Sequence, residues 1–357
     1  MQLKNLLAAA ICTADTRLRR GVLLLVSSLI LSVCLTSCGW LDEDPIFEYP
    51  HEEGIDPTLV TVNLTYHCCG DIPLYDVEYV TKSASNTLEI RRYNYEIISA
   101  DSIVRKGTIE RNINDLSDLT LSFSLPAGEY RAVMWQDCMD LYEEPFYDAS
   151  SLSAVQIREK SSYIGCTDLK DASWNITDLS IPATNEWHTT IDYDINLERP
   201  LAKITILSTD GEAFINHCTE YLRTKSPTII AQVEDRIKLC FSYEGYLLTR
   251  FNATIGEFRN SALDYSFEGQ LKETGNPSEF LIGTDYVFVD GDEGVYWIKL
   301  TVIDNYDGSI IEKTRKIRVP VKRGHETILT GNILTMCFGQ GVSIDPEFLG
   351  EFNYYFN

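Results

Sequence analysis

The sequence predicts an all-β chain that folds as two β-sandwich domains in tandem behind an amino-terminal signal segment. Many short stretches alternate apolar and polar residues, with the period of two that a half-buried strand requires. Polar turn residues separate these stretches, and helical periodicity is scarce, which is typical of β-sandwiches. Even without its first 37 residues, the 357-residue chain exceeds the usual length of one domain, so two domains are expected.

The amino-terminal segment has the features of an export signal. A basic stretch, residues 17–20, precedes residues 21–35, which are almost all apolar or small. This apolar run is too short for a typical transmembrane helix. Leu35-Thr36-Ser37-Cys38 follows, which resembles the lipobox of bacterial lipoproteins. The resemblance implies that residues 1–37 are removed as a lipoprotein signal peptide and that Cys38 is lipidated. The alternative is an ordinary secretory signal beside a coincidental cysteine.

Residues 38–54 predict an acidic tether before the first domain. Asp42-Glu43-Asp44 lies close after Cys38, and the segment is rich in charge and proline and lacks periodicity. An acidic cluster at this place resembles the surface-export signal of lipoproteins from the Bacteroidetes. It implies a lipid anchor in the outer membrane with the domains at the cell surface; a periplasmic location with a solvated tether is the alternative.

The chain is strongly acidic, with a formal net charge of −23 at pH 7. Its first 37 residues hold four basic residues and one acidic residue, a net +3, so the mature chain would carry −26. Nucleic acid is therefore not an expected partner, because phosphates need a basic surface. Electrostatic docking on an anionic bilayer is disfavoured for the same reason.

Seven cysteines follow Cys38, and their number is odd, so at least one has no intramolecular disulfide partner. We expect mainly buried free thiols, with at most one disulfide. They show no CxxC spacing, so no zinc site is predicted. These cysteines are Cys68, Cys69, Cys138, Cys166, Cys218, Cys240 and Cys337.

The first predicted domain begins with two strands of clear alternation, residues 60–66 and residues 119–125. Pro126-Ala127-Gly128 supplies turn chemistry, and residues 130–135 return as a further strand. Trp135 ends that strand, and we expect it to pack in the core of the first domain. Alternation appears again over residues 191–197, close to the end of this domain.

A domain boundary is predicted near Arg199-Pro200, because proline cannot donate to a ladder and belongs at a strand start or an edge. It separates a first domain, residues 55–198, from a second, residues 199–357. Arg199 itself could pair with an acid at the interface or be solvated.

In the second predicted domain, residues 295–303 and 310–319 flank Asn305-Tyr306-Asp307-Gly308. Asp-Gly offers the positive φ that a hairpin turn requires, so these two stretches predict a hairpin. Residues 212–222 are compatible with a short helix.

Several segments spread over the mature chain share their order and spacing with one known family. They are the lipobox, Leu125 to Tyr130, Val133-Met134-Trp135, Phe146-Tyr147-Asp148, Tyr163-Ile164-Gly165, Asp168 to Ala172, Leu197 to Ile204, Asp285 to Val289, Arg323-Gly324 and Thr327 to Thr335. Together they resemble the fimbrial minor or anchor subunit lipoproteins of Bacteroidales and their fimbrillin-like relatives. The resemblance implies two transthyretin-like β-sandwich domains, lipid attachment to the outer membrane, and other fimbrial subunits as protein partners.

Catalytic patterns are hard to find in this sequence. The five histidines form no HExxH motif, and neither a GxSxG elbow nor a Walker loop is present. Carboxylates are too abundant for a glycosidase pair to be singled out. We therefore expect no enzyme, no catalytic residue, no metal and no cofactor.

Asp101-Ser102-Ile103 resembles the acceptor pattern for O-glycosylation of exported proteins in the same phylum. Ser102 is therefore the candidate modification residue besides Cys38, and a plain loop serine is the alternative.

These observations predict a lipid-anchored fimbrial subunit that engages other subunits by β-strand addition at an open sheet edge. A surface glycan-binding lipoprotein is the alternative, and it would expose a planar cluster of aromatic rings. A hydrolase with dispersed residues, recognisable by a cleft with paired carboxylates, is a third hypothesis.

Overall fold

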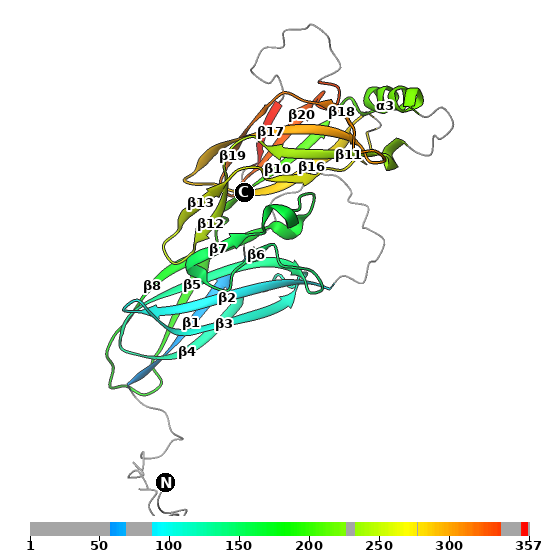
Figure 1. Cartoon of the computed structure of the whole chain (residues 1–357). Helices are drawn as coiled ribbons and strands as arrows, with labels where there is room; N and C mark the ends of the chain where they lie inside the picture. Colours follow the sequence, from blue (N-terminus) through cyan, green and yellow to red (C-terminus); the bar gives the residue numbers. More distant parts are fainter. Residues whose placement is uncertain (1–57, 69–87, 226–232, 277, 337–350, 356–357) are drawn as a thin grey trace, which may run out of the picture. The chain divides into compact units, whose positions relative to one another are not determined.

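The computed structural model describes residues 58–68, 88–225, 233–276, 278–336 and 351–355. Nearly all regular structure in these residues is β-strand, and α3 (Gly211–Lys225) is the α-helix among them (Figure 1). The predicted all-β class is therefore confirmed. The predicted signal peptide, residues 1–37, and the predicted tether, residues 38–54, lie outside the described residues.

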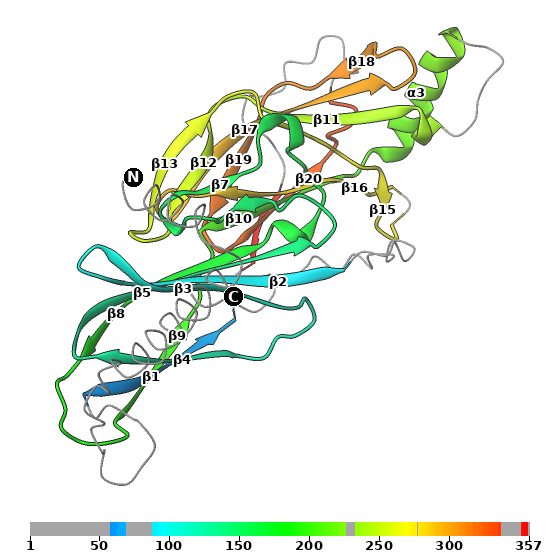
Figure 2. The ribbon, with the colours of Figure 1, turned by 60° about the horizontal axis from the view of Figure 1, so that its bottom comes forward.

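Seven strands before residue 197 form two sheets that share one hydrophobic core, and Figure 2 shows them as adjacent layers. In the three-stranded sheet β1 is central, antiparallel to β4 and parallel to β9. The four-stranded sheet has the order β3-β2-β5-β8 and is antiparallel throughout. The strands are β1 (Leu59–His67), β2 (Glu89–Ser99), β3 (Ser102–Asn112), β4 (Leu119–Pro126), β5 (Gly128–Asp140), β8 (Ala172–Ile181) and β9 (Thr190–Asn196).

Alternation predicted three of these strands, β1, β4 and β9, and in them it also determines which side chains are buried. In β1, every second residue from Val60 to Tyr66 is buried, as a period of two requires. The predicted strands over 60–66, 119–125, 130–135 and 191–197 correspond to β1, β4, part of β5 and β9.

Two five-stranded sheets lie in the second half of the chain. The strands β10 and β16, which pair with each other in one of these sheets, are buried at every position, so the period of two that marks a half-buried strand is absent there. One sheet has the order β15-β16-β10-β20-β21, with β10 parallel to β20. Its strands are β10 (Leu201–Ser208), β15 (Lys272–Glu273), β16 (Phe280–Phe288), β20 (Glu326–Gly331) and β21 (Glu351–Tyr355).

The other five-stranded sheet contains the predicted hairpin, with one difference. β17 (Glu293–Asp304) turns through Gly308, which has φ +72°, into β18 (Ile310–Lys313). The stretch 310–319 is interrupted after β18, and β19 (Ile317–Lys322) pairs with the other end of β17. At the break, the Thr314 hydroxyl accepts a hydrogen bond from the Leu300 backbone N–H at 2.9 Å, so a side chain satisfies this donor where the pairing of β18 has ended. The remaining strands are β11 (Ile237–Tyr243) and β14 (Ser266–Glu268).

The short helix compatible with residues 212–222 is present as α3. It buries Phe214, Cys218 and Leu222, which are spaced by four residues and therefore lie on one face. That face packs into the larger hydrophobic core of the molecule.

A fifth sheet, of four short strands, combines strands from both sides of Arg199-Pro200. Its order is β13-β12-β7-β6, in which β6 (Tyr147–Asp148) and β7 (Val155–Ile157) join β12 (Leu247–Asn252) and β13 (Glu257–Ala262). The hydrophobic core beneath it also draws on both halves of the chain, and residues Pro57–Asn357 form one compact unit. The division into separate domains 55–198 and 199–357 stays a prediction.

The expectation that Trp135 packs in the core of the first domain is wrong. The side chain is fully buried, but it packs against Tyr147, Phe251 and Phe288, at ring-centroid distances of 5.4, 6.0 and 6.5 Å, in the core that both halves share. The first sandwich core instead takes its neighbour Met134, because successive residues of β5 point to opposite faces of the sheet.

Candidate functional site

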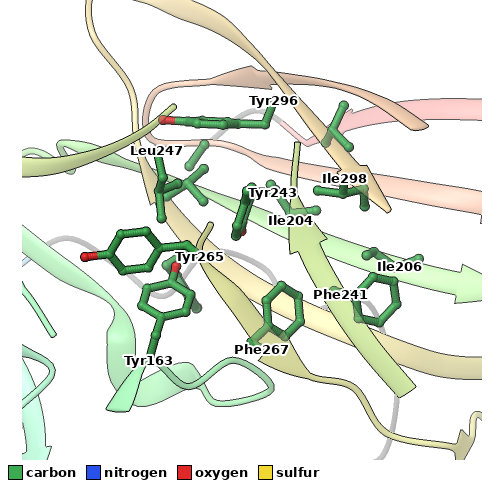
Figure 3. Close-up of a cluster of buried hydrophobic side chains, with 14 of the residues drawn as sticks. Tyr163, Ile204, Ile206, Phe241, Tyr243, Leu247, Tyr265, Phe267, Tyr296 and Ile298 are labelled. Carbon is green, nitrogen blue, oxygen red and sulfur yellow. The ribbon is translucent and has the colours of Figure 1, made fainter. Parts of the chain in front are cut away.

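Segments that carry the sequence resemblance meet in one buried group of charged and hydroxyl side chains, which we call the junction cluster. Figure 3 shows the hydrophobic cluster around two of its members, Tyr163 and Tyr243, with Tyr265 and Phe267 beside them. The members are Tyr163, Asp168, Lys170, Asp171, Arg199, Lys203, Thr205, Tyr243, Asp285, Tyr286 and Glu326.

Asp285, on β16, is the central acceptor of the junction cluster. Its Oδ2 accepts hydrogen bonds from the hydroxyls of Tyr163 at 2.7 Å and Tyr243 at 2.6 Å. Its Oδ1 accepts the backbone N–H of Tyr286 at 2.9 Å and is paired with the Lys170 ammonium. Because a buried carboxylate is costly without such donors, these contacts allow Asp285 to lie in the core.

Lys170 reaches Asp285 from a 3-10 turn, Asp168–Lys170, whose first residues are capped by the Thr167 hydroxyl. The Lys170 Nζ also lies 3.9 Å from the centre of the Tyr163 ring. Burial lowers the pKa of Lys170, and the Asp285 charge opposes that shift. Burial raises the pKa of Tyr163 and of Tyr243 well above the ordinary value, and the charge of Asp285 adds to both shifts.

A second buried ion pair lies on the neighbouring strands. The Lys203 Nζ, on β10, is 2.9 Å from Asp168 Oδ1 and 3.8 Å from Glu326 Oε1 on β20. Glu326 Oε1 also accepts the Thr205 hydroxyl at 2.5 Å. Burial raises the pKa of Glu326, and the positive charge of Lys203 opposes the shift.

Arg199 pairs with an acid, which was one of the two alternatives open from the sequence. Its Nε and Nη2 donate to the two carboxylate oxygens of Asp171, each at 2.8 Å, in a bidentate pair. Three ionic side chains of the segment from Asp168 to Asp171 thus contact β10, β16 and Arg199, which lies just before β10. The arrangement holds that segment to the sheet.

Ser102 is exposed at the first position of β3, directly after a two-residue turn. Ala100 and Asp101 form this turn with φ values of 47° and 63°. The position is accessible to a modifying enzyme, and O-glycosylation of Ser102 stays a prediction. Cys38, the predicted lipidation residue, lies outside the described residues.

The described cysteines include four free thiols in different surroundings: Cys68, Cys166, Cys218 and Cys240. Burial raises the pKa of Cys166 to about 11 and that of Cys218 to about 12, so both are protonated and poorly reactive at neutral pH. Cys69 and Cys337 lie outside the described residues.

In the part of the chain that the structure describes, no group of three or more histidine, cysteine or acidic side chains is arranged to hold a metal ion. Among the same residues, no helix is long and apolar enough to cross a membrane.

Residues 57–356 match a family model described as "Family of unknown function (DUF6562)". Comparison with curated proteins gives no match.

Solved structures give several fold neighbours. A putative adhesin from Bacteroides thetaiotaomicron is 10% identical, with a TM-score of 0.41 and coverage of 79% of this chain and 94% of that chain. The fimbrial anchor protein from Porphyromonas gingivalis is 11% identical, with a TM-score of 0.39 and coverage of 76% and 90%. The tip fimbrial protein of the same organism is 11% identical, with a TM-score of 0.38 and coverage of 83% and 98%.

Proposed function

Since this chain belongs to the family of unknown function DUF6562, whose description states no activity, we propose its function from its own residues. It is a lipid-anchored fimbrial subunit, an anchor or minor component, that binds other fimbrial subunits by β-strand addition. Cys38 carries the lipid, and residues 38–54 lift the folded unit from the outer membrane at the cell surface. No catalytic step is part of this function.

The observation that carries the proposal is the β9 edge of the first sandwich. β9 is the last strand of the sheet β4-β1-β9, so its outer backbone groups have no strand beside them among the described residues. Its core-facing residues Ile191 and Tyr193 are only partly buried, whereas their β1 partners Val62 and Leu64 are fully buried. The core therefore becomes thinner toward this edge.

A strand added beside β9 would pair the outer backbone groups of β9 and cover its partly buried apolar side chains. Its backbone would pair with the outer N–H and C=O groups of β9, and its alternate side chains would cover Ile191 and Tyr193. The opposite edge, β4, is better sealed, because Leu119, Leu121 and Leu125 are buried. β9 is thus the edge of this sheet at which an added strand gains the most buried apolar surface.

Site-specific photo-crosslinking in intact cells tests this function. A photoreactive residue replaces Asp192, which is exposed on β9, and a matched one replaces Ser124, which is exposed on the β4 edge. We expect Asp192 to capture fimbrillin-like sandwich proteins and Ser124 to capture few or none. Equal capture from both edges, or none from either, would contradict strand addition at β9.

Cys38→Ser tests the anchoring role separately. With serine at this position we expect the protein and its crosslinked partner to be released from the membrane fraction while the crosslink itself persists. Surface fimbriae that stay attached at normal length would count against an anchor.

A further inference from the structure

We propose that a cavity between β2, β3 and the β6–β7 segment binds a neutral saccharide (Figure 1 locates these strands). The cavity has a volume of about 870 Å³, within the range of small-molecule sites. This site is independent of the proposed assembly role, since it lies on the four-stranded sheet and the β9 edge lies on the other sheet.

Two buried donors at the cavity have no hydrogen-bond partner in the structure: Asn94 Nδ2 and Arg158 Nη2. Asn94 is 9% exposed and Arg158 is 8% exposed. Both side chains are held in place by their other atoms, because Asn94 Oδ1 accepts the Thr108 hydroxyl at 2.7 Å and Arg158 Nε donates to the Pro145 carbonyl at 3.0 Å. Buried donors are normally satisfied, so these two favour a ligand that brings acceptor oxygens.

The wall beside these donors is rigid. Arg92 donates from Nε and Nη2 to the two carboxylate oxygens of Asp137, at 2.9 and 2.6 Å, and from Nη2 to the Tyr147 carbonyl at 3.0 Å. Asp137 also accepts the Trp135 indole N–H at 3.0 Å. The Arg158 guanidinium lies 4.3 Å from the centre of the Phe146 ring. A site with fixed side chains loses little conformational freedom on binding.

The rim of the cavity presents the opposite chemistry. It carries four exposed carboxylates, which can only accept hydrogen bonds when ionised. They are Glu110, Glu144, Asp148 and Glu159.

A ligand must therefore accept hydrogen bonds at the buried donors and donate them at the rim. A hydroxyl group does both, so a compound with several hydroxyls fits all parts of the lining. Asp137 already neutralises the Arg92 charge, so the cationic side chain left in the lining is Arg158, against four rim carboxylates. This excess of negative charge disfavours an anionic ligand. An ammonium ligand has no acceptor to offer Asn94 and Arg158. These requirements together point to a neutral saccharide.

A glycan array followed by calorimetric titration tests the proposal with the full folded chain. The probes are neutral oligosaccharides built from glucose, galactose, mannose, xylose and N-acetylglucosamine, with sialylated and sulfated glycans beside them. We expect binding of at least one neutral probe and of no anionic one. Thr108→Val removes the hydrogen bond that holds the Asn94 side chain, and Glu110→Gln removes a charged acceptor at the rim. Each substitution should lower the affinity for the neutral probe by about fivefold or more, because each costs about one hydrogen bond.

Both substitutions are at exposed strand positions, so the variants should fold. Asp101→Asn is the matched control: it removes the same charge as Glu110→Gln from the same hairpin, but lies outside this cavity, and should leave the affinity unchanged. The proposal fails if no neutral probe binds even when its concentration reaches about 10 mM or more. It also fails if anionic glycans bind instead, or if the two cavity variants bind like the control.

Discussion

Asp285 shows how a single buried carboxylate can hold together segments that are far apart in sequence. It is 1% exposed and contacts Tyr163, Lys170, Tyr243 and the Tyr286 backbone. The sequence resemblance included the segments of Tyr163, Lys170 and Asp285, but no local pattern indicates that they meet. Their meeting depends on the pairing of β10 with β16 and on the path of the chain from Tyr163 to Lys170, which periodicity does not encode.

Asp285→Asn should destabilise the protein by about 3–5 kcal/mol, because it leaves the Lys170 ammonium buried without an opposite charge. Urea denaturation followed by tryptophan fluorescence measures the free energy of unfolding. Asp178→Asn is the matched control: its pair with Arg131 is exposed, at 43% and 75% side-chain exposure, so its loss should cost less than about 1 kcal/mol. Equal losses in the two variants would show that the buried pair has no special role.

At the scale of the element, strands with one buried face could be predicted from alternation, whereas strands with two buried faces were missed, like β2, or predicted only in part, like β5. β1 and β9 alternate cleanly and were identified over most of their length. β2 reads Glu-Ile-Arg-Arg-Tyr-Asn-Tyr-Glu-Ile-Ile-Ser and buries side chains on both faces, so no period of two appears. The core that buries Trp135 was predicted wrongly for the same reason. One face of β5 covers the core of the first sandwich, and the other face covers the core that both halves share.

The turn between β2 and β3 provides a prediction at this scale. Ala100 is exposed and adopts φ 47°, a left-handed conformation that an L-residue with a Cβ adopts at a cost. Ala100→Gly should therefore raise the free energy of unfolding by about 0.5–1 kcal/mol, as the relief of strain exceeds the added freedom of the unfolded chain.

Ala127→Gly is the control for that substitution. Ala127 is also exposed in a tight turn, but it is not among the positive-φ residues. Glycine there should lower the free energy of unfolding by up to about 1 kcal/mol. Thermal unfolding followed by circular dichroism compares the two variants, and shifts of the same sign would contradict the role assigned to the Ala100 conformation.

At the scale of the whole molecule, the two halves of the chain share a sheet, a hydrophobic core and several ion pairs. β7 pairs with β12 through Val155 and Phe251, and the junction cluster joins Lys170 to Asp285 and Asp168 to Lys203. Composition and turn signals predicted where one run of strands ends and the next begins. They could not predict that β6 and β7 complete a sheet of the second half, because strands of two and three residues carry no periodic signal.

This sharing predicts how the chain unfolds. Residues 57–357 should unfold in one cooperative urea transition, and a fragment that starts at Arg199 should show none, because it lacks β7 and leaves Lys203 and Asp285 without Asp168 and Lys170. Near-ultraviolet circular dichroism of the two proteins makes the comparison. A sharp transition for the fragment alone would establish that the second half is an independent domain.

The parallel pairings of β1 with β9 and of β10 with β20 determine when folding can be completed. Each early strand must wait for a partner that is synthesised about 120–130 residues later, so the contact order is high and the chain belongs with slow folders on the millisecond-to-second scale. Until those partners arrive, the apolar faces of β1 and β10 are open to other molecules, and aggregation competes with folding. The net charge of −23 makes unfinished chains repel one another during that interval. The acidity of the sequence thus protects the folding process as well as the surface of the folded molecule.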